Sequence, residues 1–283
     1  MKYKVKKEEL LLNFLLSNVE GKSKNNIKSL LKWGNISVNG NKVMKHDFPL
    51  SIGDEVSVSF ERQQVGNFKS KINIIYEDVN IIVVDKPSGL LSVDNDKASK
   101  SLFSLVQEHL KNINKNNKLY LVHRLDKDTS GVIVFAKSVA AKKMYQENWD
   151  AIAIKRGYKA VVINNLNEDS GILKDYLVEK GTNVYVTKNP NLGKEAITKY
   201  KVIKKGKGNA LVSIELETGR KNQIRVQFAD RKSPVLGDRK YGDGKSGFNR
   251  LALHADVLEL RDPFSKKKLK FESQVPSTFH KLV

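Results

Sequence analysis

Apolar positions in the first sixty residues predict two short helices followed by small strands. Helical spacing is seen in two groups, which flank the polar stretch 20–26: Leu11, Leu12, Leu15 and Leu16, then Ile27, Leu30 and Leu31. Ile36 and Val38 alternate with polar residues before Asn39-Gly40, a pair that favours a tight hairpin turn. The alternating segment IGDEVSVSF predicts a further strand, so a small α/β unit ends at about residue 60.

The next segment, residues 61–71, reads ERQQVGNFKSK and has no apolar periodicity, which is typical of an interdomain linker. A second core begins at Ile72 and extends to residue 283. Strands are predicted in INIIYEDVNIIVVDKPSG (two), LVHRLD, GVIVFAKS, GYKAVVIN, ITKYKVIKK, ALVSIELET, LALHADVLEL and LKFE, helices near 102–110 and in AAKKMYQENW, and a hairpin turn at 206–209. Because few helices alternate with these strands, the pattern favours an α+β fold with a mainly antiparallel mixed sheet over a doubly wound parallel sheet.

Composition points to a polyanionic partner. The chain has 51 Lys and Arg against 31 Asp and Glu, a formal net charge of +20, so nucleic acid is the first partner to expect. Membrane association is not expected, because no apolar run of spanning length interrupts the basic residues. Glu8 and Glu9 break the only signal-like start, which favours a cytoplasmic protein. Without cysteine, and with five scattered histidines, neither a thiolate nucleophile nor a metal site is expected.

The segment HRLDKDTSG, residues 123–131, carries the densest set of reactive side chains. It contains two carboxylates, an arginine, a histidine and two hydroxyls between two apolar segments. Taken alone, it could equally be a solvated polar turn. Two later segments favour a site instead: TGRKNQIRVQFA, with Arg220 and Arg225 around an amide pair, and RGYKAVV, with Tyr158 among apolar residues.

These segments resemble the RluA family of pseudouridine synthases. HRLDKDTSG resembles the family's H-R-L-D-x-x-T-S-G signature, and DKPSGLLSV, VLGDRKYG and LALHA match other landmarks in the same order over about 210 residues. Residues 8–60, with WGNISVNG and GDEV, resemble the small RNA-binding domain first described in small-subunit ribosomal protein four. The resemblance implies an RNA-binding domain at 1–60, a linker at 61–71 and a catalytic domain at 72–283.

The resemblance also implies roles for individual residues. Asp126 would be the catalytic carboxylate, acting either as a nucleophile or as a base, and Arg225 would be its partner. Tyr158 would stack on the target uracil, and Arg124 would fill the space left by the extruded base. An arginine bound to RNA phosphate remains the alternative for Arg225, and an ordinary core position remains the alternative for Tyr158. Because uridine isomerisation involves no redox change or group transfer, no cofactor is expected.

Departures from the family pattern affect the RNA-facing parts. Asn222 stands where the family commonly has histidine, while Arg220 of the same segment is retained and is expected to bind RNA. Lys24 stands where a helix-start arginine is common in the N-terminal domain. Lys24, Lys28 and Lys32 are expected to contact phosphates, but lysine offers only a point charge, so recognition by this domain is expected to differ.

The sequence thus predicts a monomeric, two-domain enzyme that converts uridine to pseudouridine in structured RNA. Large-subunit ribosomal RNA is the favoured substrate, and transfer RNA is the alternative. Two other classes of protein fit the sequence less well. A non-catalytic RNA-binding protein would not need Asp126, Tyr158 and Arg225 together, and a nucleic-acid hydrolase would need clustered acids or paired histidines, which are not seen in the sequence.

Overall fold

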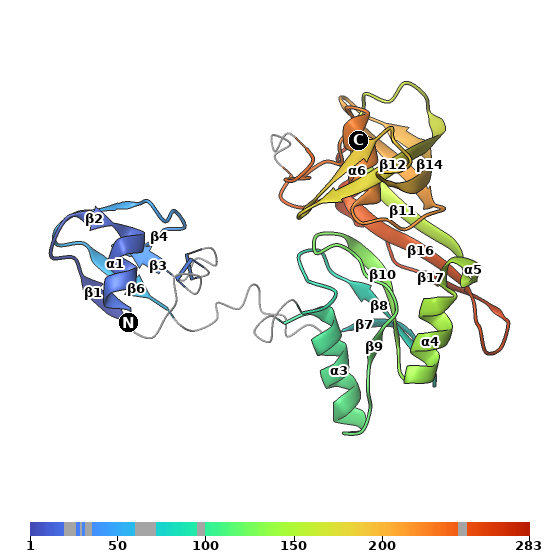
Figure 1. Ribbon diagram of the computed structural model, residues 1–283, viewed down its shortest axis with the longest axis horizontal. Coiled ribbons are helices and arrows are strands. Elements are labelled where there is room, and N and C mark those ends of the chain that lie inside the picture. Colours follow the sequence, from blue (N-terminus) through green and yellow to red (C-terminus); the bar gives the residue numbers. More distant parts are fainter. Residues whose placement is uncertain (20–26, 29, 32–35, 60–71, 95–99, 243–247) are drawn as a thin grey trace. The chain divides into compact units, whose positions relative to one another are not determined.

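The computed structural model describes residues 1–19, 27–28, 30–31, 36–59, 72–94, 100–242 and 248–283. It divides into two compact units, Met1–Lys71 and Ile72–Val283 (Figure 1). The proposed linker at 61–71 and two of the proposed RNA-binding residues, Lys24 and Lys32, lie outside the described residues. No helix in the described part of the chain is long and apolar enough to cross a membrane.

The N-terminal unit is a four-stranded sheet packed against a helix. The sheet has the order β1 (Lys2–Lys4), β6 (Glu55–Val58), β3 (Ile36–Val38) and β4 (Asn41–Lys42), and β2 (Glu9–Leu10) pairs with β5 (Pro49–Leu50). Helix α1 (Leu11–Asn18) buries Leu11, Phe14 and Leu15, because these positions recur on one helical face. The predicted turn at Asn39-Gly40 is confirmed, with φ of 50° and 81° at the two residues.

The second unit is built on one eleven-stranded sheet. Its main path runs β13-β12-β14-β15-β11-β16-β10-β8-β7, with β17 on β16 and β9 on β10. The strands are β7 (Asn73–Glu77), β8 (Ile81–Lys86), β9 (Tyr120–Leu121), β10 (Ser130–Ala136), β11 (Ala153–Ile163), β12 (Ser170–Lys180), β13 (Asn183–Thr187), β14 (Lys194–Lys205), β15 (Asn209–Leu216), β16 (Leu253–Arg261) and β17 (Lys268–Glu272). The helices are α3 (Leu102–Ile113), α4 (Val139–Glu147), α5 (Trp149–Ile152), α6 (Gln223–Asp230) and α7 (Ser277–His280). The α+β prediction is confirmed.

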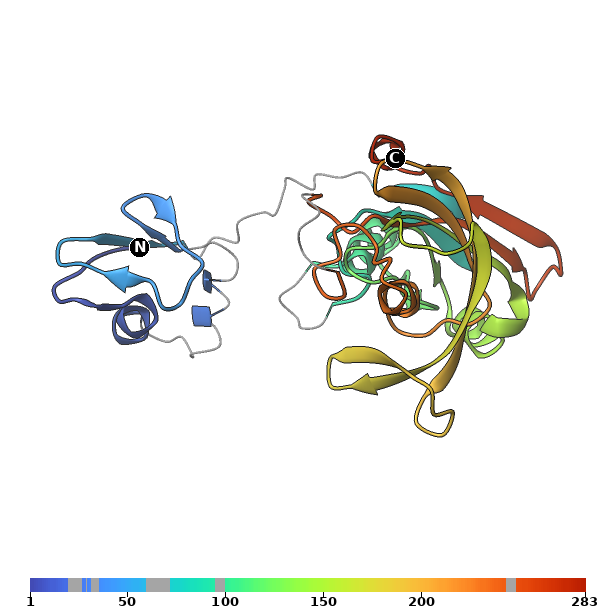
Figure 2. The ribbon, with the colours of Figure 1, turned by 90° about the horizontal axis from the view of Figure 1, so that it is seen from above.

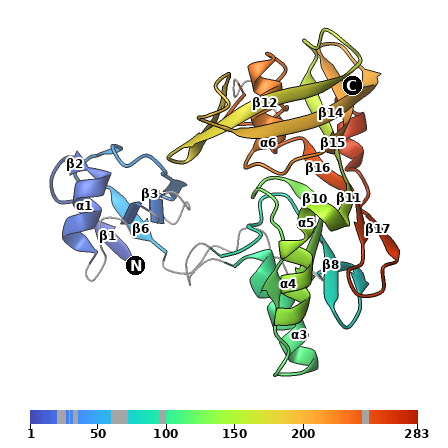
Figure 3. The same cartoon turned by 45° about the vertical axis from the view of Figure 1, so that its right-hand side comes forward.

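Two parts of this sheet are covered differently. Strands β8 and β10 are apolar at nearly every position because α3 packs on one face and α4 on the other (Figure 3). At the other end, α6 packs through Ile224 and Phe228 onto β11 and β15. Hairpin β12–β13, drawn in yellow, reaches away from the body of the unit (Figure 2).

The pairing of β10 with β16 is parallel, unlike the other strand pairs among the described residues. It brings Gly131 against Ala255, so close that an added Cβ would lie 2.0 Å from the Ala255 carbonyl oxygen. Gly131 also has a φ of 115°, which residues with a side chain rarely adopt. Glycine at this position therefore lets the start of β10 meet β16.

One strand expectation was wrong. In LVHRLD, strand β9 ends at Leu121, and residues 122–129 form a loop. Side chains replace the ladder bonds there: the Val134 amide donates to His123 Nε2 at 3.1 Å, and the Leu125 amide donates to Ser92 Oγ at 3.1 Å. The helix expected near 102–110, the helix in AAKKMYQENW and the turn at 206–209 are confirmed, whereas hairpin β12–β13 was not anticipated.

Candidate active site

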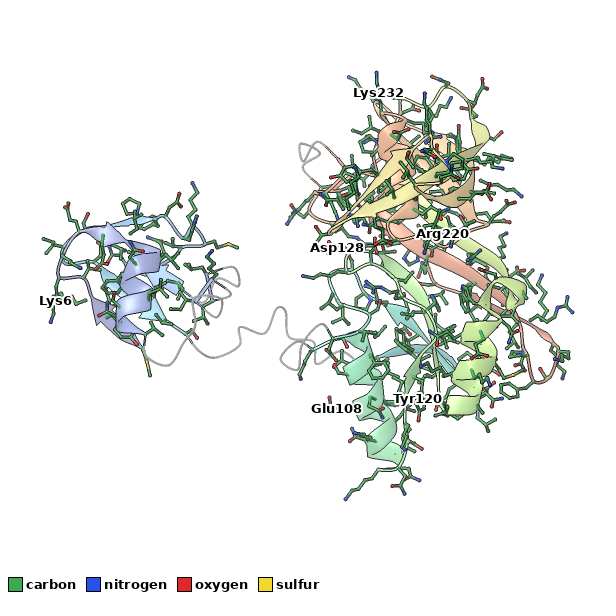
Figure 4. The ribbon with its side chains drawn as sticks, in the orientation of Figure 1. Lys6, Glu108, Tyr120, Asp128, Arg220 and Lys232 are labelled. Atoms are coloured by element: carbon green, nitrogen blue, oxygen red, sulfur yellow. The ribbon has the colours of Figure 1, made fainter. Side chains whose placement is uncertain are left out.

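Asp126 lies in the loop between β9 and β10. Its carbonyl oxygen accepts the Thr129 amide at 3.2 Å, which closes a turn over residues 126–129. The Asp126 side chain is 27% exposed, so it can be reached from solvent. Figure 4 shows neighbouring Asp128 and, from another segment, Arg220 between the part covered by α6 and the part flanked by α3 and α4. The loop therefore presents its carboxylate where the two halves of the sheet meet.

The end of β8 and the segment that follows it hold this loop through hydrogen bonds. Ser92 Oγ donates to the Leu125 carbonyl at 2.7 Å, and the Gly89 amide donates to the Lys127 carbonyl at 3.0 Å. Lys86 is fully buried, and its ammonium donates to the carbonyls of Pro87, Leu90 and Lys127 at 3.0, 2.6 and 2.8 Å. Burial lowers the pKa of Lys86 to about 7, against the opposing effect of the Asp128 and Asp126 carboxylates. Its three N–H donors join two segments that are about 40 residues apart.

Arg225, on α6, joins the loop to a second carboxylate. Its Nη1 donates to Asp126 Oδ2 at 2.9 Å, while Nε and Nη2 donate to the two oxygens of Asp238 at 2.7 and 2.8 Å. The Asp238 side chain has no exposed surface, and one of its oxygens also accepts the Lys240 and Tyr241 amides. This paired contact fixes the plane of the guanidinium, so that its remaining nitrogen is directed at Asp126.

The charges of this cluster stabilise each other. Burial alone would raise the pKa of Asp238, but the hydrogen bonds and charge of Arg225 outweigh it, so the pKa lies below its usual range. Burial likewise opposes the charge of Arg225, whose pKa is nevertheless raised by Asp238 and Asp126. Arg225 therefore carries a fixed positive charge beside Asp126.

Asn222 begins helix α6 in the left-handed conformation, with a φ of 54°, which asparagine tolerates better than most residues. Its Oδ1 accepts from Arg225 Nη1 at 3.1 Å, and its Nδ2 donates to the Tyr241 hydroxyl at 2.9 Å. The Tyr241 ring lies 5.2 Å from the Arg225 guanidinium carbon. The amide that replaces the usual histidine thus orients both neighbours.

Tyr158, on β11, lines the same hollow as Asp126 and Arg225. The hollow is also lined by Leu125, Leu216, Ile224 and Leu253, which give it apolar walls. Burial raises the pKa of Tyr158 to about 12; the charge of Arg156 opposes this, and the Asp126 carboxylate adds to it. Tyr158 is therefore a neutral phenol at ordinary pH, with its ring in a hollow that can accept a flat base.

The other residues predicted from the sequence differ in whether they line the hollow that contains Asp126. Arg124 and Arg220 also line the hollow and are exposed, and Arg220 Nε donates to the Glu195 carbonyl at 2.9 Å. Lys28 belongs to the N-terminal unit, where it is exposed. His123 is half-buried, and loss of solvation together with the charge of Arg156 lowers its pKa to about 3, so it is neutral. The structure brings Asp126, Tyr158 and Arg225 together.

Sequence reasoning missed Asp238 and Lys86 as parts of the site. Asp238 belongs to VLGDRKYG and Lys86 to DKPSGLLSV, two segments that match family landmarks but carry no predicted site residue. A local signal existed at Lys86, because a charged residue at the end of the buried run IIVVD needs a polar partner. Nothing local marks Asp238, whose partner is 13 residues earlier on another element.

Comparisons with known proteins show the family to which the chain belongs. Residues 80–230 match the family model described as RNA pseudouridylate synthase. An uncharacterized RNA pseudouridine synthase of Mycoplasma pneumoniae is 32% identical over 281 residues, covering 95% of this chain and 90% of that protein. The ribosomal large subunit pseudouridine synthase D of Vibrio cholerae is 30% identical over 273 residues, covering 90% and 84%.

Solved structures show the same fold. Human RNA pseudouridylate synthase domain containing 4 superimposes with a TM-score of 0.63 at 24% identity, over 74% of this chain and 91% of that one. Its match supports the α+β sheet of the second unit. The family model covers more than half of the chain, and the Mycoplasma relative extends along nearly all of it. The chain therefore belongs to the RNA pseudouridine synthase family and is an RNA-modifying enzyme of the RluA type.

Proposed function

We propose that this enzyme converts specific uridines to pseudouridine in structured RNA, with Asp126 as the catalytic carboxylate. The observation that carries the proposal is the 2.9 Å contact between Arg225 and Asp126 at the wall of a hollow that Tyr158 also lines. An arginine already held by a buried carboxylate places its positive charge against Asp126 Oδ2 and leaves the other carboxylate oxygen of Asp126 available for the reaction. A solvated turn would not need such a support.

The reaction needs few groups. The bond between uracil N1 and ribose C1′ breaks, the base turns, and C5 joins C1′, while the proton on C5 is lost and N1 gains one. Asp126 begins this either as a nucleophile that adds to the sugar or base, or as a base that removes a sugar proton. Both routes require the ionised carboxylate. Tyr158 holds the uracil by stacking and places its hydroxyl near the base while C5 loses its proton.

A uridine inside a helix cannot reach this hollow, so the target nucleotide has to leave its stack. Arg124 precedes Asp126 by two residues and is exposed beside the hollow. Its planar guanidinium can occupy the space that the base leaves, and it can bond to the bases around it. In this proposal one loop supplies both the residue that replaces the base and the residue that reacts with it.

Large-subunit ribosomal RNA is the proposed substrate, with transfer RNA as the alternative. The proposal is supported by the name of the Vibrio relative and by the N-terminal unit, which by its sequence resemblance is expected to bind RNA through residues 1–60. Lys28 is exposed on that unit, and the formal charge of +20 favours phosphate-rich partners. The enzyme is proposed to act as a cytoplasmic monomer.

The deciding experiment compares Asp126→Asn with Asp128→Asn. Both variants remove one carboxylate from the same loop, but among the described residues the exposed Asp128 side chain makes no hydrogen bond, whereas its carbonyl oxygen accepts from Ser88 Oγ at 2.7 Å. Pseudouridines are mapped by chemical labelling and primer extension in ribosomal RNA from cells that lack the gene and carry each variant. We expect the modification to be restored by the wild type and by Asp128→Asn, and not by Asp126→Asn.

Affinity for RNA separates the competing interpretations. Asp126→Asn should bind substrate RNA within about tenfold of wild type, because the amide keeps the size of the side chain. Turnover retained in this variant would refute the catalytic assignment. A wild type that binds RNA but modifies no uridine in total cellular RNA would instead favour a binding protein.

A further inference from the structure

A second hollow lies beside the candidate active site, and three arginines line it. Its walls include Arg124, Arg156 and Arg220, together with the aromatic pair His123 and Trp149. It shares Tyr158 and Leu216, as well as two of the arginines, with the hollow that contains Asp126. The two hollows are therefore neighbours along β11.

Arg156 is the buried cation of this second hollow, and its bonding is incomplete. Its side chain is 10% exposed, Nη2 donates to the Glu217 carbonyl, and the buried Nε has no partner. Nη1 lies 3.6 Å from Asp150 Oδ1, too far for a hydrogen bond, and the Asp150 side chain is 87% exposed. A buried guanidinium with unused donors is costly unless an anion completes its bonds.

The surroundings leave room for an anion to approach. Gly219 lies over the guanidinium, and a Cβ at this position would be 3.1 Å from Arg156 Nη1. His123 adds no charge, because its pKa is lowered to about 3 and its ring stacks on Trp149 at 4.5 Å. Asp150 is the acidic member of the described residues that line this hollow. The hollow is therefore positively charged and has an apolar floor.

The spacing between Arg156 and Tyr158 on β11 indicates which anion the second hollow binds. Arg156 and Tyr158 both line the second hollow, and because they are two residues apart on β11 their Cα atoms are about 6.6–6.8 Å apart along the strand. One nucleotide of an unstacked RNA strand can span this distance. We propose that the second hollow binds, through Arg156, the phosphodiester of the nucleotide adjacent to the target uridine. The nucleobase of that nucleotide lies over the apolar floor of the hollow. This subsite rests on the proposed function, because Tyr158 receives the uridine there.

The first test measures binding of the full chain to fluorescent oligouridylate by anisotropy over a range of KCl concentrations. Arg156→Gln should weaken binding about tenfold and reduce the slope of log affinity against log salt by about 0.7, the value for one single-strand phosphate. Gly219→Ala should weaken binding by covering the guanidinium, and Asp150→Asn should strengthen it by removing a competing charge. Arg156→Lys should keep most of the salt slope.

The second test changes the RNA instead of the protein. Single neutral methylphosphonates are placed at successive linkages around one uridine in a short oligomer. For the wild type, one position should cost about tenfold in affinity, and for Arg156→Gln the same position should cost nothing further, because the contact is already lost. Equal losses in both proteins would overturn the proposal.

A purely structural role for Arg156 predicts a different pattern. In that case Arg156→Gln would lower the melting temperature while RNA affinity and salt slope stayed at wild-type values, and Asp150→Asn would have no effect on binding. These results would also overturn the subsite. Neither binding test depends on turnover, so a chain that binds oligouridylate in the expected way but fails to isomerise uridine would refute the proposed function while still showing that Arg156 binds a phosphodiester.

Discussion

The link between Arg225 and Asp238 gives a quantitative prediction. In Arg225→Ala the Asp238 carboxylate, which has no exposed surface, loses two charge-assisted hydrogen bonds and keeps only the Lys240 and Tyr241 amides. Arg225→Ala should therefore lower the free energy of unfolding by about 3–5 kcal/mol, the cost of removing one partner from a buried ion pair. Asp126 also loses its partner but adds little, because its side chain is 27% exposed and water can solvate it.

The double variant Arg225→Ala/Asp238→Ala separates charge burial from lost packing. Removing the Asp238 charge as well should raise the free energy of unfolding by at least about 1 kcal/mol relative to Arg225→Ala, because no unpaired carboxylate remains in the interior. The assay is urea unfolding followed by fluorescence of Trp149 in a Trp33→Phe background, so that the signal comes from the catalytic unit. Activity should be lost in both variants.

The pH dependence of the free energy of unfolding tests the role of Asp238 independently. With Arg225 present, the pKa of Asp238 is below its usual range, so its stabilising contribution is complete above the unfolded pKa and is lost as pH falls through the folded pKa. Without Arg225, burial raises that pKa and protonation relieves the strain. The stability deficit of Arg225→Ala should therefore narrow as pH is lowered from 8 toward 5. A deficit under about 1 kcal/mol, or one independent of pH, would refute the reasoning.

Four further outcomes are expected. Tyr158→Phe should slow turnover while keeping RNA affinity, whereas Tyr158→Ala should lose both in single-turnover and binding assays; wild-type rates in both would remove Tyr158 from the site. The pKa of Lys86 is about 7 in the folded state against an ordinary value of 10.5, so the unfolded state binds more protons between these two pH values and the free energy of unfolding should rise with pH there. Activity should fall over the same range, because Lys86 loses a proton and with it a donor to the Lys127 carbonyl. Urea unfolding of Lys86→Met should show no such rise in stability. Gly131→Ala should destabilise the fold by more than about 3 kcal/mol, and Gly181→Ala, with positive φ but open space, by only about 1; equal losses by calorimetry would contradict the crowding. Deletion of residues 1–60 should weaken RNA binding and leave a soluble, folded catalytic unit by circular dichroism, and aggregation would show that the boundary is misplaced.

Much of the strand pattern could be predicted because period-two and continuous apolar runs are local signals. The loop at 122–129 could not be predicted, because it is held by side-chain hydrogen bonds of Ser92 and His123 with backbone amides instead of by strand partners. Tyr158, Asp126 and Arg225 were predicted through family motifs, and no spacing in the chain implies that they meet. Asp238 was missed for the same physical reason: a carboxylate in a polar segment looks solvated until its distant arginine is placed.

The ties around Asp126 have a consequence for how the enzyme is made. The loop at 122–129 is completed by Lys86 and Ser92 before it, by Arg225 and Asp238 about 100 residues after it, and by Ala255 against Gly131. Chains emerge from the ribosome in sequence order, and contacts of such long separation form slowly. A nascent chain that has reached residue 200 has its early strands, both flanking helices and the contacts of Lys86 and Ser92 with the loop, but it lacks Arg225, which holds the Asp126 carboxylate. Catalytic competence is therefore acquired only near the end of synthesis.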